Sequence, residues 1–295
     1  MYTCICSLLI AAIALTASAE NIVADGATLE TLATEFAFTE GPAADAQGNV
    51  YFTDQPNDRI VVWSTDEKLS TYMQPSGRSN GLCFDAKGAL WACADEKNEL
   101  WRIAKDKTYE TMLDRFDGKL LNAPNDLWIT PGGAIYFSDP YYKRDYWTRG
   151  PAEQDVEAVY YIPAPGKPAI RVITDLKQPN GLIGTPDGKT LYVADIGGNK
   201  TWKYSIGSDG ALSGKALFCE LGSDGMTIDS EGNVYLTGKG VIVFNPAGEQ
   251  IAHIEVPMPW TANVCFGGAD KKSLFITAST GLYRMRMRVS GVDSQ

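Results

Sequence analysis

Six polar side chains recur at nearly constant spacing along this 295-residue sequence, each just ahead of a short apolar run. A β-strand in a protein core would ordinarily carry Val or Ile at such a position. The six residues are Glu40, Asn80, Asn125, Asn180, Asp224 and Asn263. Asn and Asp often satisfy backbone groups at strand ends, which accounts for most of this set but less easily for Glu40. If the six side chains meet, their oxygens form a site for a hard divalent cation such as Ca²⁺, which takes about six to eight oxygen ligands. Cation binding is the better explanation of the set.

The sequence around each of these residues follows one pattern, represented by residues 123–140, APNDLWITPGGAIYFSDP. Two short β-rich runs flank a Pro-Gly-Gly break, which predicts a hairpin. The leading polar residue and the aromatic residue of the second run are 11 or 12 positions apart in all six copies, and successive leading residues stand 40, 45, 55, 44 and 39 positions apart. Repeats of roughly 40–45 residues made of strands are typical of propeller blades. We therefore predict an all-β, six-bladed β-propeller; a β-sandwich would leave the spacings to chance.

A propeller would bring the six leading residues together, because the first strand of each blade lines the central channel. A strand predicted within residues 28–36 should complete the last blade and close the ring, which removes an open sheet edge. The second strand of the third hairpin is followed by the longest loop, residues 140–157, which is rich in aromatic and basic side chains. Such a loop at the channel mouth is predicted to be a lid or substrate wall, or else a surface loop or oligomer contact.

The first 19 residues have the features of an export signal. An apolar stretch precedes Ala17-Ser18-Ala19, which fits a cleavage site. We expect residues 1–19 to be a signal peptide without a lipid anchor, residues 20–295 to be a single propeller domain, and the protein to be periplasmic or secreted. The net charge of −10 argues against nucleic acid or an anionic membrane as a partner. The four remaining cysteines have no zinc spacing, and sequence cannot assign their pairing.

The residue types restrict the chemistry. The sole histidine, His253, lies in a strand-like stretch away from the leading positions, which argues against a Ser-His-Asp triad and His-rich zinc sites. No phosphate-binding glycine loop and no dinucleotide fingerprint occur. A metal with oxygen ligands remains, suited to activating a carbonyl or phosphoryl group and water.

Five sequence strings resemble the family of gluconolactonase, regucalcin (senescence marker protein) and related lactonases. They are residues 40–42 (EGP), 121–127 (LNAPNDL), 136–140 (YFSDP), 179–182 (PNGL) and 223–226 (SDGM). The resemblance implies a small-molecule sugar lactone as substrate and one divalent cation in the channel, with Ca²⁺ the first candidate and Mg²⁺, Mn²⁺ or Zn²⁺ also compatible. By motif match, the metal ligands would be Glu40, Asn125, Asn180 and Asp224, and Asp224 would also accept and donate the proton.

The predicted substrate contacts are Asn80, Asn122, Asn125, Asp139, Tyr142 and Arg144. Similar lactonases often carry Arg where this chain has Leu120, and Arg144 or Lys143 on the long loop would have to replace it. Two other functions fit the same residues: a phosphotriesterase-like hydrolase, because diisopropyl fluorophosphatase is similar in fold and metal site, and a non-catalytic propeller that binds calcium or another ligand.

Overall fold

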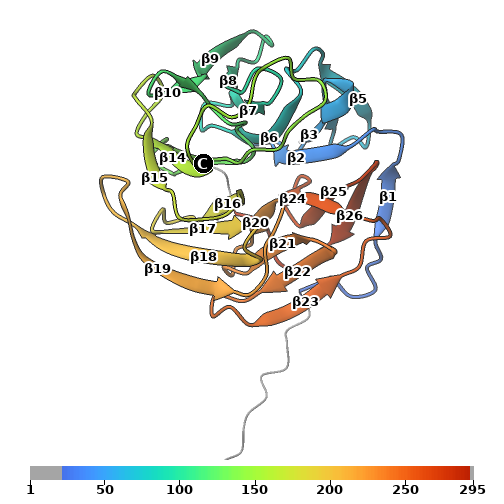
Figure 1. Ribbon diagram of the computed structural model, residues 1–295. Coiled ribbons are helices and arrows are strands. Elements are labelled where there is room, and N and C mark those ends of the chain that lie inside the picture. Colours follow the sequence, from blue (N-terminus) through green and yellow to red (C-terminus); the bar gives the residue numbers. More distant parts are fainter. Residues whose placement is uncertain (1–21, 293–295) are drawn as a thin grey trace, which may run out of the picture.

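The computed structural model describes residues 22–292, and these form six four-stranded antiparallel sheets around a central channel. Figure 1 looks down the channel, with one blade following the next around the ring. The predicted six-bladed propeller is confirmed. The predicted signal peptide and its cleavage site lie outside the described residues and stay a prediction.

The blades run from the channel outward in chain order. Blade 1 comprises β2 (Thr39–Ala44), β3 (Val50–Asp54), β4 (Arg59–Trp63) and β5 (Leu69–Met73). Blade 2 comprises β6 (Ser79–Phe84), β7 (Leu90–Ala94), β8 (Glu99–Ile103) and β9 (Tyr109–Leu113). Blade 3 comprises β12 (Leu127–Ile129), β13 (Ile135–Asp139), β14 (Ala158–Ile162) and β15 (Ile170–Ile173).

The second half of the ring repeats this plan. Blade 4 comprises β16 (Pro179–Gly184), β17 (Thr190–Asp195), β18 (Lys200–Ile206) and β19 (Leu212–Cys219). Blade 5 comprises β20 (Met226–Ile228), β21 (Val234–Gly238), β22 (Gly240–Phe244) and β23 (Gln250–Ile254). Blade 6 comprises β24 (Thr261–Gly267), β25 (Ser273–Ala278), β26 (Gly281–Arg286) and β1 (Glu30–Ala33). A 3-10 turn, η1 (Gln55–Asn57), and a small hairpin of β10 (Arg115–Phe116) and β11 (Lys119–Leu120) lie between strands.

The ring closes as predicted, through a strand from the amino-terminal end of the described chain. β1 pairs antiparallel with β26 and becomes the outermost strand of blade 6. The first and last parts of the chain thereby share one sheet, so no blade is left with three strands. The observed strand lies inside the predicted range of residues 28–36.

Three of the inner hairpins share one turn chemistry. In the first, Asp45 Oδ1 accepts the backbone N–H groups of Gln47 and Asn49, and Gly48 has a positive φ of 90°. Asp85 and Asp229, each followed three residues later by Gly, accept backbone N–H groups in the same way in blades 2 and 5. In these blades the turn residues therefore help to fix the register of the inner strand against the second strand.

The apolar core lies between neighbouring blades. The face of blade 2 that carries Trp91 and Leu100 packs against Ile135, Phe137 and Tyr160 of blade 3. Equivalent clusters fill the other junctions, including that between blades 5 and 6. Because each blade buries both faces against its neighbours, the inner strands are held at fixed positions around the channel.

Candidate functional site

The first strands of the blades carry the six leading residues to one end of the channel. Five of the six side chains are buried, and Asp224 is partly exposed. Glu40, Asn80, Asn180 and Asn263 lie within β2, β6, β16 and β24. Asn125 and Asp224 lie one or two residues ahead of β12 and β20, since pairing starts only at Leu127 and Met226 in those blades.

Irregular pairing directs several of these side chains. The register of β2 against β3 shifts between Glu40 and Ala43, and comparable shifts occur at Ser79–Leu82 and Pro179–Leu182. A bulge turns a side chain away from the direction that regular pleating would give, and bulges are frequent beside functional sites. Here the bulges coincide with three of the leading residues.

Glycines after the leading residues let the inner strands approach one another. A Cβ atom at Gly181 would lie 2.3 Å from the carbonyl oxygen of Asp224, and one at Gly225 would lie 1.8 Å from Cγ of Asn263. A Cβ atom at Gly41 would likewise lie 2.0 Å from the carbonyl oxygen of Asn80. Only glycine allows this approach, so the motifs place the leading residues of successive blades next to one another.

The charges of three carboxyl groups influence one another at this end of the channel. The pKa of Glu40 is raised well above its ordinary value by burial, then by the charges of Asp224 and Asp126, while the N–H of Gly41, which donates to Oε2 at 2.6 Å, opposes the shift. The pKa of Asp126 is raised to about 7, first by burial and further by the charge of Asp224. Burial raises the pKa of Asp224 to about 6, against the opposing effects of Trp260, Asn180 and Arg144. Negative charge is therefore concentrated here without full compensation, as expected of a cation site.

Asp224 is held by neighbours from two directions. The indole N–H of Trp260 donates to its Oδ2 at 2.6 Å, and the amide of Asn180 forms a hydrogen bond on the other side. Asn180 also donates through Nδ2 to the phenol oxygen of Tyr142 at 2.9 Å. Glu40, Asn180, Asp224 and Tyr142 thus belong to one contiguous polar group.

The donor set fits a hard divalent cation. Two carboxylates from Glu40 and Asp224 face the same region, and no hydrogen bond joins the side chains of Asn80 or Asn125 to any residue in the described range. Within residues 22–292 no three His, Cys, Asp or Glu side chains form a metal-binding group by themselves. A cation held here would therefore need amide oxygens beside the two carboxylates, a composition that suits Ca²⁺ rather than a His- or Cys-bound metal.

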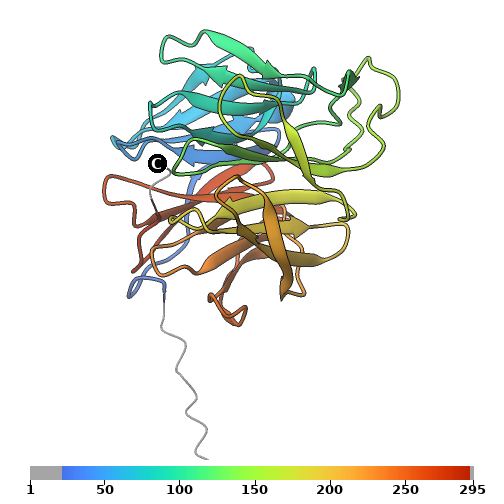
Figure 2. The ribbon, with the colours of Figure 1, turned by 90° about the vertical axis from the view of Figure 1, so that its left-hand side faces the viewer.

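The long loop of residues 140–157 contains no strand or helix and connects β13 to β14. In Figure 1 it crosses in front of blade 2, and in the side view of Figure 2 it projects from one face of the disc. Arg144 lies over the ring of Tyr142, 5.3 Å from its centroid, and its charge lowers the pKa of Asp224. The loop therefore covers the end of the channel where the leading residues meet.

Asn122 and Asp139 serve largely to build blade 3. Both oxygens of Asp139 accept backbone N–H groups, from Asn122 at 2.9 Å and Ala123 at 2.8 Å, and the Asn122 amide donates to the carbonyls of Asp139 and Val156. Both side chains are almost completely buried. Their predicted contact with substrate stays a prediction.

Leu120, where similar lactonases often carry Arg, is bound to the long loop through its backbone. Its N–H donates to Glu153 Oε2 at 2.7 Å, and its carbonyl accepts from Gln154 Nε2 at 3.0 Å. The cationic side chain that faces the polar group is Arg144 instead. The long loop therefore lies directly beside Leu120.

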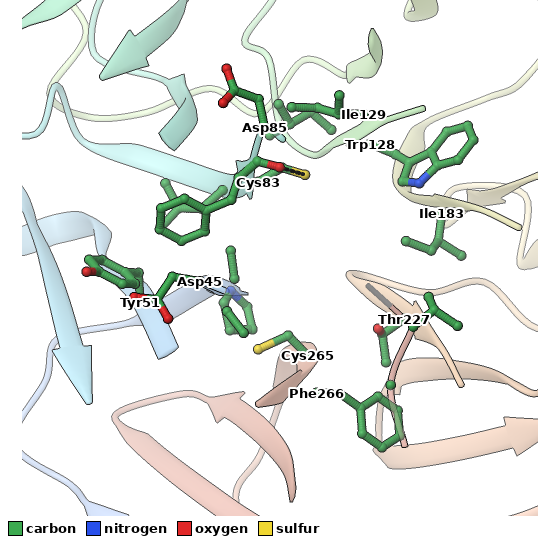
Figure 3. Close-up of a pocket in the computed structure, with 18 of the residues that line it drawn as sticks. Asp45, Tyr51, Cys83, Asp85, Trp128, Ile129, Ile183, Thr227, Cys265 and Phe266 are labelled. Carbon is green, nitrogen blue, oxygen red and sulfur yellow. Dashed lines mark hydrogen bonds between the residues drawn. The ribbon is translucent and has the colours of Figure 1, made fainter. Parts of the chain in front are cut away.

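On the opposite face the channel widens into a cavity of about 910 Å³ (Figure 3). Cys83, Trp128, Ile183 and Cys265 are among the largely apolar side chains that line it, and Asp126 and Asn263 form its inner end. Burial raises the pKa of the Cys83 thiol to about 12, so the thiol stays protonated near neutral pH. Ionisable side chains line this cavity as well, among them Asp45, Tyr51 and Asp85 (Figure 3).

Two further residues, Asp126 and Trp260, interact with this polar group but were not among the predicted site residues. Asp126 follows Asn125 within the hairpin motif, which was a signal for it. Trp260 has no equivalent in the repeat, so nothing in the spacing indicated it. His253, in contrast, lies on the outer strand β23, where its Nε2 forms a hydrogen bond of 2.9 Å with the carbonyl of Lys239.

Residues 38–280 match the sequence profile of the SMP-30/Gluconolactonase/LRE-like region. The chain belongs to this family. The resemblance inferred from the five sequence strings is thereby confirmed.

Family members with known names are similar over most of their length. The gluconolactonase of Zymomonas mobilis is 28% identical over 89% of this chain and 82% of its own. The structure of a gluconolactonase from Xanthomonas campestris superposes with a TM-score of 0.84 at 29% identity, covering 90% of this chain and 91% of the other. A calcium-binding regucalcin from Agrobacterium tumefaciens shares the fold, with a TM-score of 0.76 at 19% identity over 90% of this chain and 96% of its own. The family relationship suggests a divalent cation.

The remaining structural expectations concern cysteines and membrane spans. Cys83, Cys93, Cys219 and Cys265 are buried free thiols. None of the elements between residues 22 and 292 is a helix long and apolar enough to cross a membrane.

Proposed function

We propose that this protein is a metal-dependent lactonase that opens a sugar lactone by hydrolysis. The observation that carries the proposal is the meeting of Glu40, Asn180 and Asp224 beneath a loop that presents Tyr142 and Arg144. The gluconolactonase relatives support a lactone as the substrate class.

Glu40, Asn125, Asn180 and Asp224 would hold the cation, and Ca²⁺ is the first candidate because every proposed ligand is an oxygen. When bound, a divalent cation supplies Lewis-acid polarisation of the lactone carbonyl and of water. The raised pKa values of Glu40 and Asp224 support this assignment, since a nearby cation compensates buried negative charge.

Asp224 is proposed to move the proton. Its carboxylate takes a proton from the attacking water and returns it to the ring oxygen as the C–O bond breaks. Trp260 fixes one carboxylate oxygen, so the group keeps one orientation through the cycle.

The hydroxyl groups of the substrate are proposed to contact the loop. Arg144 uses Nε for Asp95, and its two terminal nitrogens form no hydrogen bond to any other part of the described chain. The phenol of Tyr142 and the amides of Asn80 and Asn125 add further polar groups. Arg144 thereby supplies the positive charge that Leu120 does not.

The test is acid release from glucono-1,5-lactone in a pH-stat, with metal-stripped protein before and after adding Ca²⁺, and a blank for spontaneous hydrolysis. We expect hydrolysis that requires the ion and stops on chelation. Hydrolysis of aryl phosphotriesters in preference to lactones would favour the phosphotriesterase alternative. Absence of turnover with every ion, despite ion binding, would favour a binding protein.

We also propose that the protein is exported, which rests on the apolar amino-terminal stretch and Ala17-Ser18-Ala19. Mass analysis of the mature protein from the periplasm or medium should find Glu20 at the amino terminus. Recovery of the uncleaved chain in the cytoplasmic fraction alone would refute it.

A further inference from the structure

Four blades place an aspartate at the end of their second strand. Three of these carboxylates accept hydrogen bonds from the backbone just ahead of the inner strand. Asp54 accepts the backbone N–H of Ala37 at 2.9 Å, and Asp195 accepts that of Gln178 at 2.9 Å. Asp139 accepts the N–H groups of Asn122 and Ala123, as described above. Each carboxylate fastens the segment that leads into the inner strand of its own blade.

Asp95, the equivalent residue of blade 2, is engaged differently. In blade 2 the segment before the inner strand β6 is held by Asp58 of blade 1 instead. The Oδ1 of Asp58 accepts the N–H groups of Ser76 at 2.9 Å and Arg78 at 2.7 Å. The Asp95 carboxylate is thereby left for other partners. Its side chain is nevertheless buried, with 1% of its surface exposed.

The partners of Asp95 come mainly from the long loop of blade 3. Its Oδ2 accepts from Arg144 Nε at 2.8 Å and from the Tyr146 hydroxyl at 2.7 Å, and its carbonyl oxygen accepts from Trp147 Nε1 at 2.8 Å. Gln55 of blade 1 donates to the same Oδ2 at 3.0 Å. Three loop side chains thus converge on one residue of a different blade.

This junction is connected directly to the candidate site. The Arg144 guanidinium lies over the Tyr142 ring, and the Tyr142 hydroxyl accepts from Asn180. We propose that Asp95 is a positioning residue that holds residues 140–157 in place as the substrate-selecting roof of the channel. As a statement about selectivity, this inference rests on the proposed lactonase function.

The chemistry of the held groups indicates what the roof selects. Arg144 and Tyr142 offer hydrogen bonds to the hydroxyl groups of a sugar lactone, whereas an unsubstituted lactone has only its two ester oxygens as partners and loses every hydroxyl contact. Loss of the junction should therefore weaken binding of a polyhydroxylated lactone and leave a bare lactone of the same ring size unaffected. Glucono-1,5-lactone and δ-valerolactone provide this comparison.

The variant Asp95→Asn removes the charge while keeping the size of the side chain. Asp195→Asn is the matched control, because Asp195 is a buried carboxylate at the same strand position that accepts hydrogen bonds from Lys177, Gln178 and Gly198, none of which belongs to the loop. We expect Asp95→Asn to raise KM for glucono-1,5-lactone about tenfold, with kcat and the KM for δ-valerolactone within about twofold of wild type. Asp195→Asn should leave the ratio of the two KM values unchanged. In an Arg144→Ala background, Asp95→Asn should raise KM no further.

A second measurement does not depend on activity. Trypsin should cleave the Asp95→Asn protein after Lys143, Arg144 or Arg149 several times faster than wild type, as mass spectrometry of early fragments would show. If wild type hydrolyses no lactone, the proposed function fails and this cleavage comparison alone decides whether Asp95 holds the loop. Wild-type KM values and wild-type cleavage in Asp95→Asn would overturn the inference, as would the same changes in Asp195→Asn.

Discussion

Glu40, Asp126 and Asp224 bring three carboxyl groups into one electrostatic unit. Burial raises the pKa of each of them, and the charge of Asp224 raises the pKa values of Glu40 and Asp126 further. An arrangement of this kind is unfavourable when charged unless a cation compensates it, and the neighbouring Arg144 supplies only one positive charge, which it shares with Asp95. The electrostatics of the residues therefore favour a site built for a bound ion.

The replacement Asp224→Asn tests the residue with two proposed roles. The amide cannot accept the proton and is a weaker ligand, so kcat/KM should fall by about 10³-fold or more and Ca²⁺ affinity should also fall. Steady-state kinetics with saturating Ca²⁺ and a calorimetric titration would measure both effects.

Asp229→Asn is a suitable control for this experiment. Asp229 lies in the same blade and is buried, but its carboxylate holds the turn at the other end of β20 through Glu231 and Asn233. The folded control protein should turn over lactone at the wild-type rate. Near-normal turnover by Asp224→Asn would disprove the assigned role.

Sequence alone identified the residues that the repeat defines. Glu40, Asn180 and Asp224 hold the same position in the hairpins of blades 1, 4 and 5, so their placement around the channel follows from the symmetry of the fold. Trp260 could not be predicted, because it approaches Asp224 from a connecting segment outside the repeat. Its role depends on how blades 5 and 6 pack, and the local pattern carries no such information.

At the scale of elements, the inner strands and the long loop have different origins. The strands are positioned by turn chemistry, bulges and close glycine contacts that are all local to the motifs, and for this reason the hairpins were predictable. The loop was predictable in place and composition only. Its attachment to Asp95 depends on residues about fifty positions apart in neighbouring blades.

The replacement Gly181→Ala tests whether close strand approach supports the site. The new methyl group would lie 2.3 Å from the carbonyl oxygen of Asp224, so the strands must separate. We expect the free energy of unfolding to fall by about 1–3 kcal/mol and Ca²⁺ affinity to fall with it. Chemical denaturation and calorimetry would measure the two quantities.

Gly132→Ala provides the comparison, because its nearest neighbour, Thr130 Oγ1, would be at an ordinary 3.8 Å. That variant should match wild type in both measurements. If Gly181→Ala also matches wild type, close packing at this position is not needed to form the site.

At the scale of the whole molecule, ring closure makes the site a property of all six blades. Strand β1 joins the two ends of the described chain in one sheet, and cores between blades transmit its position around the ring. Repeat spacing was sufficient to predict this closure. The repeat spacing could not predict the largely apolar cavity at the channel end opposite the long loop. The shape of this cavity depends on the sizes of side chains from all six inner strands.

The pH dependence of stability should report the buried carboxyl groups of the metal-free protein. The pKa values of Asp126, about 7, and Asp224, about 6, are raised above the ordinary aspartate value of 3.8. At pH values between the ordinary and the raised pKa, the folded state binds more protons than the unfolded chain. The free energy of unfolding should therefore decrease as pH rises from 5 to 7. We expect the Tm of metal-stripped protein to fall by roughly 5 °C over this range.

Calcium should reverse this trend, because it binds the deprotonated carboxylates and stabilises the protein more at pH 7 than at pH 5. The variant Asp126→Asn should show a weaker decline in the metal-free state. Thermal unfolding at pH 5, 6 and 7, with and without Ca²⁺, would measure these effects. A metal-free Tm that stays constant or rises between pH 5 and 7 would contradict the electrostatic interpretation.

Calorimetric titration of metal-stripped protein with Ca²⁺, in wild type and in Glu40→Gln, tests the central claim most directly. Coordination by Glu40, Asn125, Asn180 and Asp224, as proposed above, predicts one ion per chain in wild type and at least about 100-fold weaker binding in Glu40→Gln. Wild-type protein that binds no ion, or a Glu40→Gln variant that binds Ca²⁺ as tightly as wild type, would contradict the claim.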